Sequence, residues 1–200
     1  MRLPARCAMK MIKNIFSKLY LYVLWAMFSV IFVGWIFTMI TDTIPKHKVT
    51  VYVDVLSLEE IGLREELEKS KPDDIKMVKA YPFTYATFSA ASILYGDLYI
   101  IKESDVEEYL SSFSPLSEDL LSAYTDRGLY VSEGVAYGIK VYDAGTETGC
   151  ATAYINYAPL PEEEAEDYYL FFNRESFHTG ELNGSEDDAA LIVADAFLSL

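Results

Sequence analysis

The pattern of hydrophobic and polar positions divides the chain near residue 41. The run LYLYVLWAMFSVIFVGWIFTMI, residues 19–40, contains no charged residue. At about 1.5 Å of rise per residue, this run is about 33 Å long as a helix, enough to cross the hydrocarbon core of a bilayer. It is too long for a signal-peptide core, and TDTIPKHK after it has no small-residue cleavage site. The sequence predicts a transmembrane helix over residues 19–40, in contact with the lipid bilayer.

After a connector at residues 41–48, strand patterns alternate with helix patterns. Residues 49–55, 75–83 and 97–101 are runs typical of strands. Helices are predicted after each strand, at 57–69, at 88–95 with Gly96 as a left-handed terminating residue, and at 104–113. This order predicts right-handed crossovers and a mostly parallel sheet with helices on both faces. The third helix presents one apolar face, formed by Val106, Tyr109, Leu110 and Phe113.

Three helix starts are predicted from capping-box spacing, in which a Ser precedes an acidic residue by three positions. The pairs are Ser57 with Glu60, Ser104 with Glu107, and Ser185 with Asp188.

The second half of the chain is less regular. It predicts a short helix in 115–124, a hairpin over 128–143 that turns at Ser132-Glu133-Gly134, and strands in 151–159 and 168–172. A terminal amphipathic helix presents Ala189, Ile192, Val193, Ala196, Phe197 and Leu200 on one face. The predicted fold class is α/β: one N-terminal transmembrane helix, then a single three-layer, mostly parallel-sheet domain at 49–200 with an antiparallel hairpin.

Charge is distributed unevenly between the two parts. Residues 1–48 carry seven Lys or Arg and one Asp, whereas residues 49–200 carry 9 basic and 30 acidic side chains, which makes net charges of +6 and −21. By the positive-inside rule, the basic segment 1–18 lies in the cytoplasm and the domain is extracytoplasmic, on a single-pass protein of the cell membrane. A surface this acidic repels nucleic acid, so no nucleic-acid partner is predicted.

Candidate catalytic chemistry is sparse. No nucleophile elbow, phosphate-binding loop or dinucleotide-binding motif occurs, and His47, His178 and Cys150 lack zinc-ligand spacing. Cys150 is predicted as a small buried core residue, with a Cys150–His178 dyad as the alternative. The acidic runs at 162–167 and 186–188 are interpreted as solvated faces, with calcium binding as the alternative. No catalytic residue, metal or cofactor is predicted.

Two segments carry a family resemblance. GDLYIIKESDVEEYLSSFSPLSEDL, residues 96–120, and GVAYGIKVYD, residues 134–143, resemble parts of extracellular solute-binding proteins. The resemblance covers residues 49–142 and implies an α/β lobe of the kind that binds a sugar, peptide or small metabolite for an ABC transporter. Members of that family are commonly more than twice as long, with two lobes, and are lipid-anchored or free. Closure of two lobes on a ligand is therefore not carried over.

Ligands of open α/β sheets bind outside the carboxyl ends of the strands. In this sequence the edge includes Asp54 and Ser57 after the first strand and Ser104 after the third. The candidate ligand-binding residues are Tyr81, Phe83, Tyr85, Lys102, Glu103 and, by resemblance, Tyr137. The predicted function is a membrane-anchored binding or interaction module for a small molecule or an envelope protein. The alternatives are an anchored enzyme with an unrecognised site and an accessory half of a split solute-binding protein.

Overall fold

The computed structural model describes residues 18–41, 43–83, 96–159, 161, 164–185 and 187–200. The chain divides into two compact units, Met1–Thr43 and Ile44–Leu200. The helix predicted at 88–95 and the candidate residue Tyr85 lie outside the described residues.

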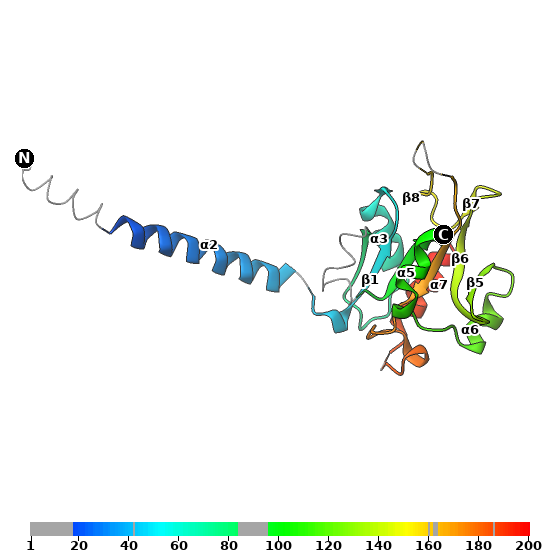
Figure 1. Cartoon of the computed structure of the whole chain (residues 1–200). Coiled ribbons are helices and arrows are strands. Elements are labelled where there is room, and N and C mark those ends of the chain that lie inside the picture. The colour runs from blue at the N-terminus through cyan, green and yellow to red at the C-terminus, as the bar shows by residue number, and fades with distance from the viewer. Residues whose placement is uncertain (1–17, 42, 84–95, 160, 162–163, 186) are drawn as a thin grey trace, which may run out of the picture. The chain divides into compact units, whose positions relative to one another are not determined.

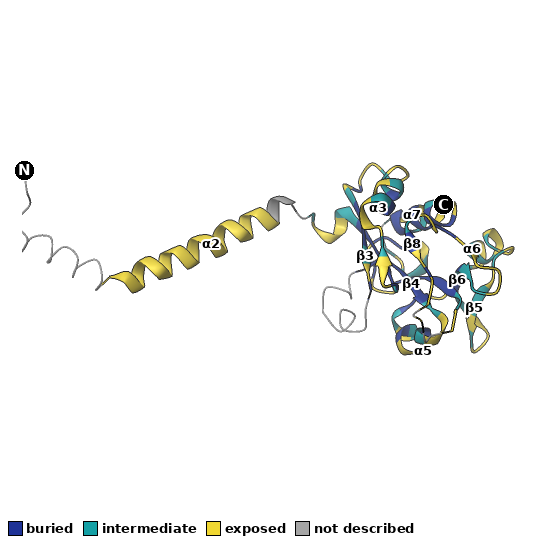
Figure 2. Ribbon diagram, turned by 90° about the horizontal axis from the view of Figure 1, so that it is seen from above, coloured by how far each residue is buried: buried dark blue, intermediate teal, exposed yellow. Residues whose placement is uncertain are grey.

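The first unit contains the helix α2, Leu19–Thr41. Its segment Leu19–Thr38 has a mean hydropathy of 2.0, and none of it is buried. Figure 2 colours this helix as exposed up to residue 38. By length and composition it can cross a membrane, as the apolar run predicts.

The second unit is built on a seven-stranded mixed sheet (Figure 1). The strand order is β3-β1-β4-β9-β6-β5, with β7 paired to β6. Strand β1 is parallel to β3 and to β4, which confirms the predicted parallel block. Strand β9 pairs antiparallel with both β4 and β6 and joins this block to the β5–β6 hairpin. The strands are β1 Lys48–Val53, β3 Met77–Pro82, β4 Leu98–Lys102, β5 Leu129–Ser132, β6 Val135–Asp143, β7 Thr148–Gly149 and β9 Tyr168–Phe172.

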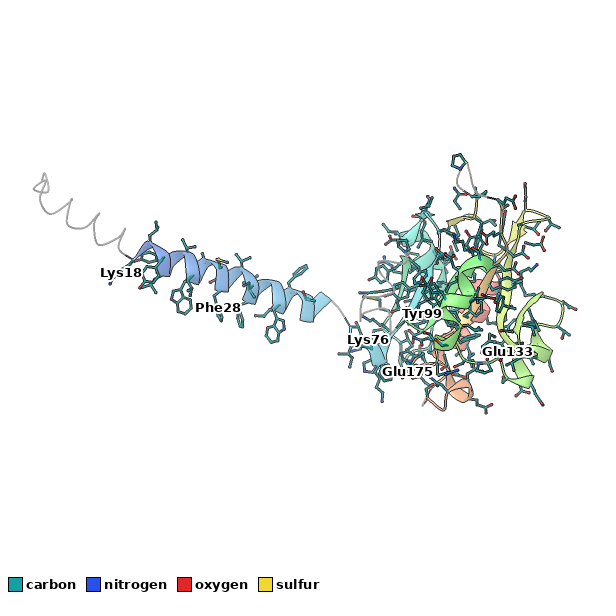
Figure 3. The ribbon with its side chains drawn as sticks, viewed as in Figure 1. Lys18, Phe28, Lys76, Tyr99, Glu133 and Glu175 are labelled. Carbon is teal, nitrogen blue, oxygen red and sulfur yellow. The ribbon has the colours of Figure 1, made fainter. Side chains whose placement is uncertain are left out.

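The predicted hairpin turn is confirmed. Glu133 and Gly134 have φ values of 53° and 82°. Positive φ at both central residues characterises the turn type whose twist matches that of paired strands. Figure 3 shows Glu133 at the outer end of this hairpin, whereas Tyr99 of β4 lies among packed side chains.

Helices cover both faces of the sheet, as predicted. Alternate residues of β4 point to opposite faces, because side chains alternate along a strand. Leu98 and Ile100 belong to a largely aliphatic core with α3 (Glu60–Glu68) and α7 (Ala189–Leu198). Tyr99 and Ile101 belong to a mainly aromatic core with α5 (Val106–Tyr109). The short helix α6, Glu118–Ala123, is also confirmed, and Ser117 Oγ accepts a hydrogen bond from Leu120 N at its start.

The three predicted capping boxes are wrong. Ser57 belongs to a two-residue strand, β2 (Ser57–Leu58), which pairs with β8 (Ile155–Asn156). Helix α3 starts two residues later, where Glu59 accepts a hydrogen bond from Gly62 N at 2.7 Å. Strand pairing takes the backbone of Ser57 out of the helix, so a nearby carboxylate replaces the hydroxyl as cap.

The other two sites fail for similar reasons. Ser104 lies inside a 3-10 turn, Glu103–Asp105, and its hydroxyl bonds to Asp105. At the start of α7, Asp187 Oδ1 accepts the hydrogen bond from Ala189 N, and Ser185 Oγ bonds to Asp187 O instead.

Three further expectations need correction. The buried side of α7 is formed with Ala190 and Ala194, whereas Ile192 and Leu200 are 39% and 44% exposed, because small alanines permit closer packing on the sheet. Gly96 does not have positive φ. A Cβ there would lie 2.6 Å from the Tyr52 ring, so close packing requires the glycine. The predicted strand at 151–159 is reduced to β8.

Candidate functional site

The carboxyl ends of the three parallel strands form a compact edge. Val53 of β1 is in register with Pro82 of β3 and Ile100 of β4. The chain leaves β1 and β3 still bonded to the sheet, because Asp54 N donates to Ile100 O at 2.8 Å and Phe83 N donates to Val53 O at 2.7 Å. Asp54, Phe83 and Lys102 therefore mark this edge, where open α/β sheets bind ligands.

Asp54 has the most unusual environment at this edge. Its Oδ2 atom is buried and has no hydrogen-bond partner among the described residues. Burial and, to a smaller extent, the neighbouring carboxylate of Asp105 raise the pKa of Asp54 to about 6, against the opposing effect of Lys102. The ammonium of Lys102 lies 3.6 Å from Asp105 Oδ2. Asp54 is thus a partly buried carboxyl group with a raised pKa, and one of its oxygens is available to a donor.

The aromatic candidate residues occupy different environments. Phe83 is only 2% exposed and packs edge-on against Tyr99 and Tyr109, with ring centroids 6.0 and 5.4 Å away. It is a core residue. Tyr81 is half-buried, with its ring 5.9 Å from that of Tyr52. Of these two rings, that of Tyr81 is the more accessible.

The remaining candidate residues lie apart from Asp54 or face solvent. Glu103 is exposed, and its backbone N donates to Asp167 O. Tyr137 precedes Gly138, which is paired through Phe171 with Tyr99 near the amino end of β4. The sheet register therefore places Tyr137 toward the opposite end of the strands from Lys102. Its half-buried ring packs against the aromatic core.

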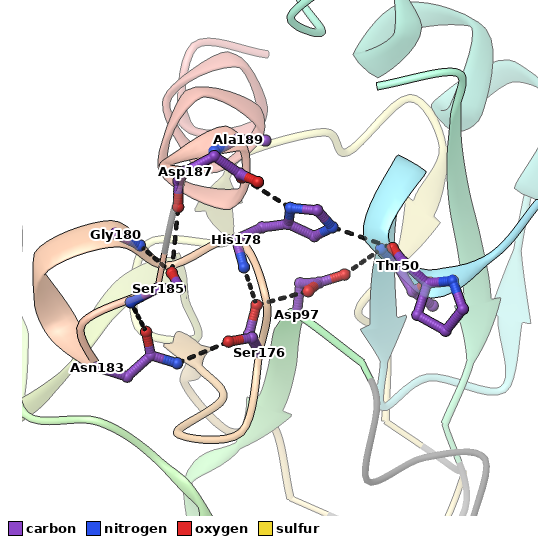
Figure 4. Close-up of polar contacts among 10 residues, drawn as sticks. Thr50, Asp97, Ser176, His178, Gly180, Asn183, Ser185, Asp187 and Ala189 are labelled. Carbon is purple, nitrogen blue, oxygen red and sulfur yellow. Dashed lines mark hydrogen bonds and ion pairs between the residues drawn. The ribbon is translucent and has the colours of Figure 1, made fainter. Parts of the chain in front are cut away.

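A buried polar network lies at the amino end of the same strands (Figure 4). Asp97, directly before β4, accepts hydrogen bonds from Thr50 N at 2.7 Å and from Ser176 Oγ at 2.5 Å. Ser176 Oγ in turn accepts from His178 N at 2.9 Å. Sequence analysis missed Asp97 and Ser176, and it interpreted Asp187 only as part of a solvated acidic run. The one available signal was a polar residue placed directly before an apolar strand.

His178 connects this network to the start of the folded unit. Its side chain has no exposed surface; Nδ1 lies 2.7 Å from Asp187 Oδ1, and Nε2 lies 3.1 Å from Pro45 O. A carbonyl oxygen only accepts, so Nε2 carries a proton. Burial by itself lowers the pKa of His178, but the bonds to Pro45 O and Asp187 outweigh it, and the pKa is raised. We call the His178 bonds to Pro45 and Asp187 the histidine clamp.

The network does not have the geometry of a catalytic triad. Ser176 Oγ donates to Asp97, and the Nε2 atom of His178 faces a carbonyl oxygen rather than the hydroxyl. Cys150 is 5% exposed and contacts Arg127 Nη1 at 3.0 Å and Leu198 O at 3.5 Å, so its predicted burial is confirmed. Cys150 and His178 thus have separate partners and do not form the alternative dyad.

The acidic runs bond within the fold where the structure describes them. Glu166 accepts from Ser104 N, and Asp167 accepts from Ala144 N and pairs with Lys140. Among the described residues, no group of three or more His, Cys, Asp and Glu is arranged to hold a metal. No protein-family model and no curated protein matches the chain.

Proposed function

We propose that the protein is a single-pass, membrane-anchored binding module. Helix α2 lies in the bilayer, and the folded unit is extracytoplasmic, where it binds a small polar molecule at the edge marked by Asp54. The length and apolar composition of α2 support the anchor. The basic residues at 1–18 support a cytoplasmic N-terminus.

The proposal of a binding site rests on the Oδ2 atom of Asp54, which has no partner in the part of the chain that the structure describes. A buried acceptor without a partner costs about 1–3 kcal/mol, and a ligand donor removes this cost. The ligand class is accordingly a small molecule with hydroxyl or amino groups, such as a sugar, an amino acid or a peptide amino terminus. The acidity of residues 49–200 favours the cationic members of this class.

A thermal-shift screen of the full chain in detergent tests the binding site. The panel contains sugars, amino acids, short peptides and polyamines. A ligand at 100 times its Kd adds about 2.7 kcal/mol of stability, which raises Tm by about 5–10 °C for a domain of this size. Asp54→Asn should abolish the shift. Glu65→Gln, which alters an exposed acid on α3, should retain it. An equal rise in Tm for Asp54→Asn would show that the ligand binds at another site. No rise in Tm with any compound of the panel would count against small-molecule binding.

Cysteine labelling of intact cells tests the topology. A Cys7→Ser, Asp126→Cys chain carries an exposed thiol on the folded unit, whereas Cys150 is buried. A membrane-impermeant maleimide should label this thiol without lysis. Labelling that requires lysis would place the folded unit in the cytoplasm.

A further inference from the structure

We propose that the surface formed by Ile44, Lys46 and Phe177 is a membrane-contact face that rests in the interfacial layer of the bilayer. This inference depends on the proposed anchoring of α2. The new element is that the folded unit contacts the lipid through a defined surface, in addition to its covalent link to α2.

The first observation is an apolar surface at the start of the folded unit. Ile44 is 62% exposed and Phe177 is 49% exposed. Both side chains line one open cavity of about 450 Å³, together with Pro45, Lys46, Gly184, Ser185 and Asp187. Two large apolar side chains that share one hollow mark a contact surface more strongly than isolated ones do.

The second observation is the short distance along the chain from α2. This helix ends at Thr41, three residues before Ile44. At no more than about 3.6 Å per residue, Ile44 lies within about 11 Å of the helix end. Each polar interfacial layer of a bilayer is about 5–8 Å thick. If α2 crosses the membrane, Ile44 is therefore in or beside the interfacial layer.

The third observation is that this segment is fixed to the folded unit. Residues Pro45–His47 form a 3-10 turn, and His47 O accepts from Lys76 N at 2.9 Å. The histidine clamp bonds Pro45 O to the residue that follows Phe177. Ile44 and Phe177 thus belong to one body, and the chain-length limit on Ile44 brings Phe177 close to the lipid as well.

The side chains of this surface are of the kinds that contact the interfacial layer of a lipid bilayer. Aromatic rings favour the membrane interface, and Ile44 beside Phe177 adds apolar surface that the lipid can cover. Asp187, the acidic residue lining the cavity, is directed to the His178 ring. Because residues 49–200 carry a net charge of −21, the matching surface is zwitterionic rather than anionic lipid.

A fluorophore measurement on the full chain tests the proposal. In a Cys7→Ser background, Phe177→Cys is labelled with the environment-sensitive dye NBD and reconstituted into phosphatidylcholine vesicles. The matched control is Val131→Cys, an apolar position on the β5–β6 hairpin that is 55% exposed. The dye at position 177 should emit at shorter wavelength and be quenched at least twofold more by spin-labelled lipids than the dye at position 131. Ile44→Cys provides a second site with the same expectation.

The outcomes separate the two proposals. A chain that fails to float with the vesicles defeats the anchor. A chain that floats while positions 44 and 177 behave like position 131 overturns the contact face alone. Protection of position 177 in native membranes but not in pure lipid vesicles would assign the surface to a protein partner, and this also overturns the inference.

Discussion

Asp54 and Asp97 are two buried carboxyl groups at opposite ends of the same parallel strands. Burial raises the pKa of each to about 6. Their partners differ. Asp97 accepts from the backbone of Thr50 and the hydroxyl of Ser176, one bond on each oxygen. In contrast, Asp54 has one buried oxygen without a partner among the described residues, and it lies near the carboxylate of Asp105.

The comparison shows that a raised pKa does not by itself distinguish a functional carboxyl group from a structural one. The number of hydrogen-bond partners of the carboxyl oxygens does distinguish them. A buried polar group with all its partners fixes the packing of the elements around it. A buried polar group at the ligand-binding edge that has no partner in the described structure costs stability. A ligand that bonds to the group offsets that cost. The structural role belongs to Asp97, and we assign the binding role to Asp54.

The largest expected effect comes from Asp97→Ala. This change leaves Thr50 N and Ser176 Oγ buried without their acceptor, and should lower the free energy of unfolding by about 3 kcal/mol. For a domain of this size that corresponds to a fall in Tm of about 10 °C. Urea unfolding of the folded unit, which has its own core, measures the change. Asp97→Asn, which keeps one carbonyl acceptor, should cost less. A loss below about 1 kcal/mol for Asp97→Ala would end the structural assignment.

The next largest effect is expected for His178→Ala. The substitution removes both bonds of the histidine clamp and leaves Pro45 O and Asp187 without their donor. We expect a loss of about 2 kcal/mol. His47→Ala, which alters the other, half-buried histidine, is the control and should change stability by less than about 1 kcal/mol. Equal losses in the two variants would show that the clamp contributes nothing specific.

The two ends of the strands also differ in how far the sequence predicts them. The alternation of apolar strands and helices predicts β1, β3 and β4, and the rule for open α/β sheets predicts that Asp54 and Lys102 meet at one edge. Asp97 joins Ser176 and His178 only through tertiary folding, because Asp97 and Ser176 are 79 positions apart in the chain. No local spacing signals such a contact, so the network could not be predicted.

The predictions of helix starts from sequence are wrong for a related reason. The hydroxyls of Ser57 and Ser104 fit a local capping pattern, but strand pairing at Ser57 and a 3-10 turn at Ser104 take the backbone into other structures. The prediction that Tyr137 lies at the ligand-binding edge fails for the same reason, because a tertiary contact decides its place. Its position along β6 depends on the register with β9, which the sequence of either strand alone does not specify.

A smaller effect is expected from pH. The folded-state pKa values of Asp54, Asp97 and His178 are all raised. Each group therefore favours the folded state most when protonated. Stability should fall between about pH 4 and 6 as the two aspartates ionise, and again above about pH 6.5 as His178 deprotonates. We expect a total loss of about 1–2 kcal/mol between pH 5 and 8, measured as the urea midpoint. A midpoint that rises over this interval would contradict the assigned shifts.

The smallest expected effect, opposite in sign, comes from Asp54→Asn. At pH 7.5 Asp54 is largely ionised in a partly buried position beside Asp105. The amide removes that charge, still accepts from the backbone of Lys102 and donates to Asp105. Because the site is partly solvated, the gain in stability should be only about 1 kcal/mol, checked by urea unfolding against Glu65→Gln. A loss of stability would make Asp54 a second structural carboxylate like Asp97. A gain in stability combined with loss of ligand-induced stabilisation is the behaviour expected of a residue retained for binding, because functional groups are often held in environments that cost stability.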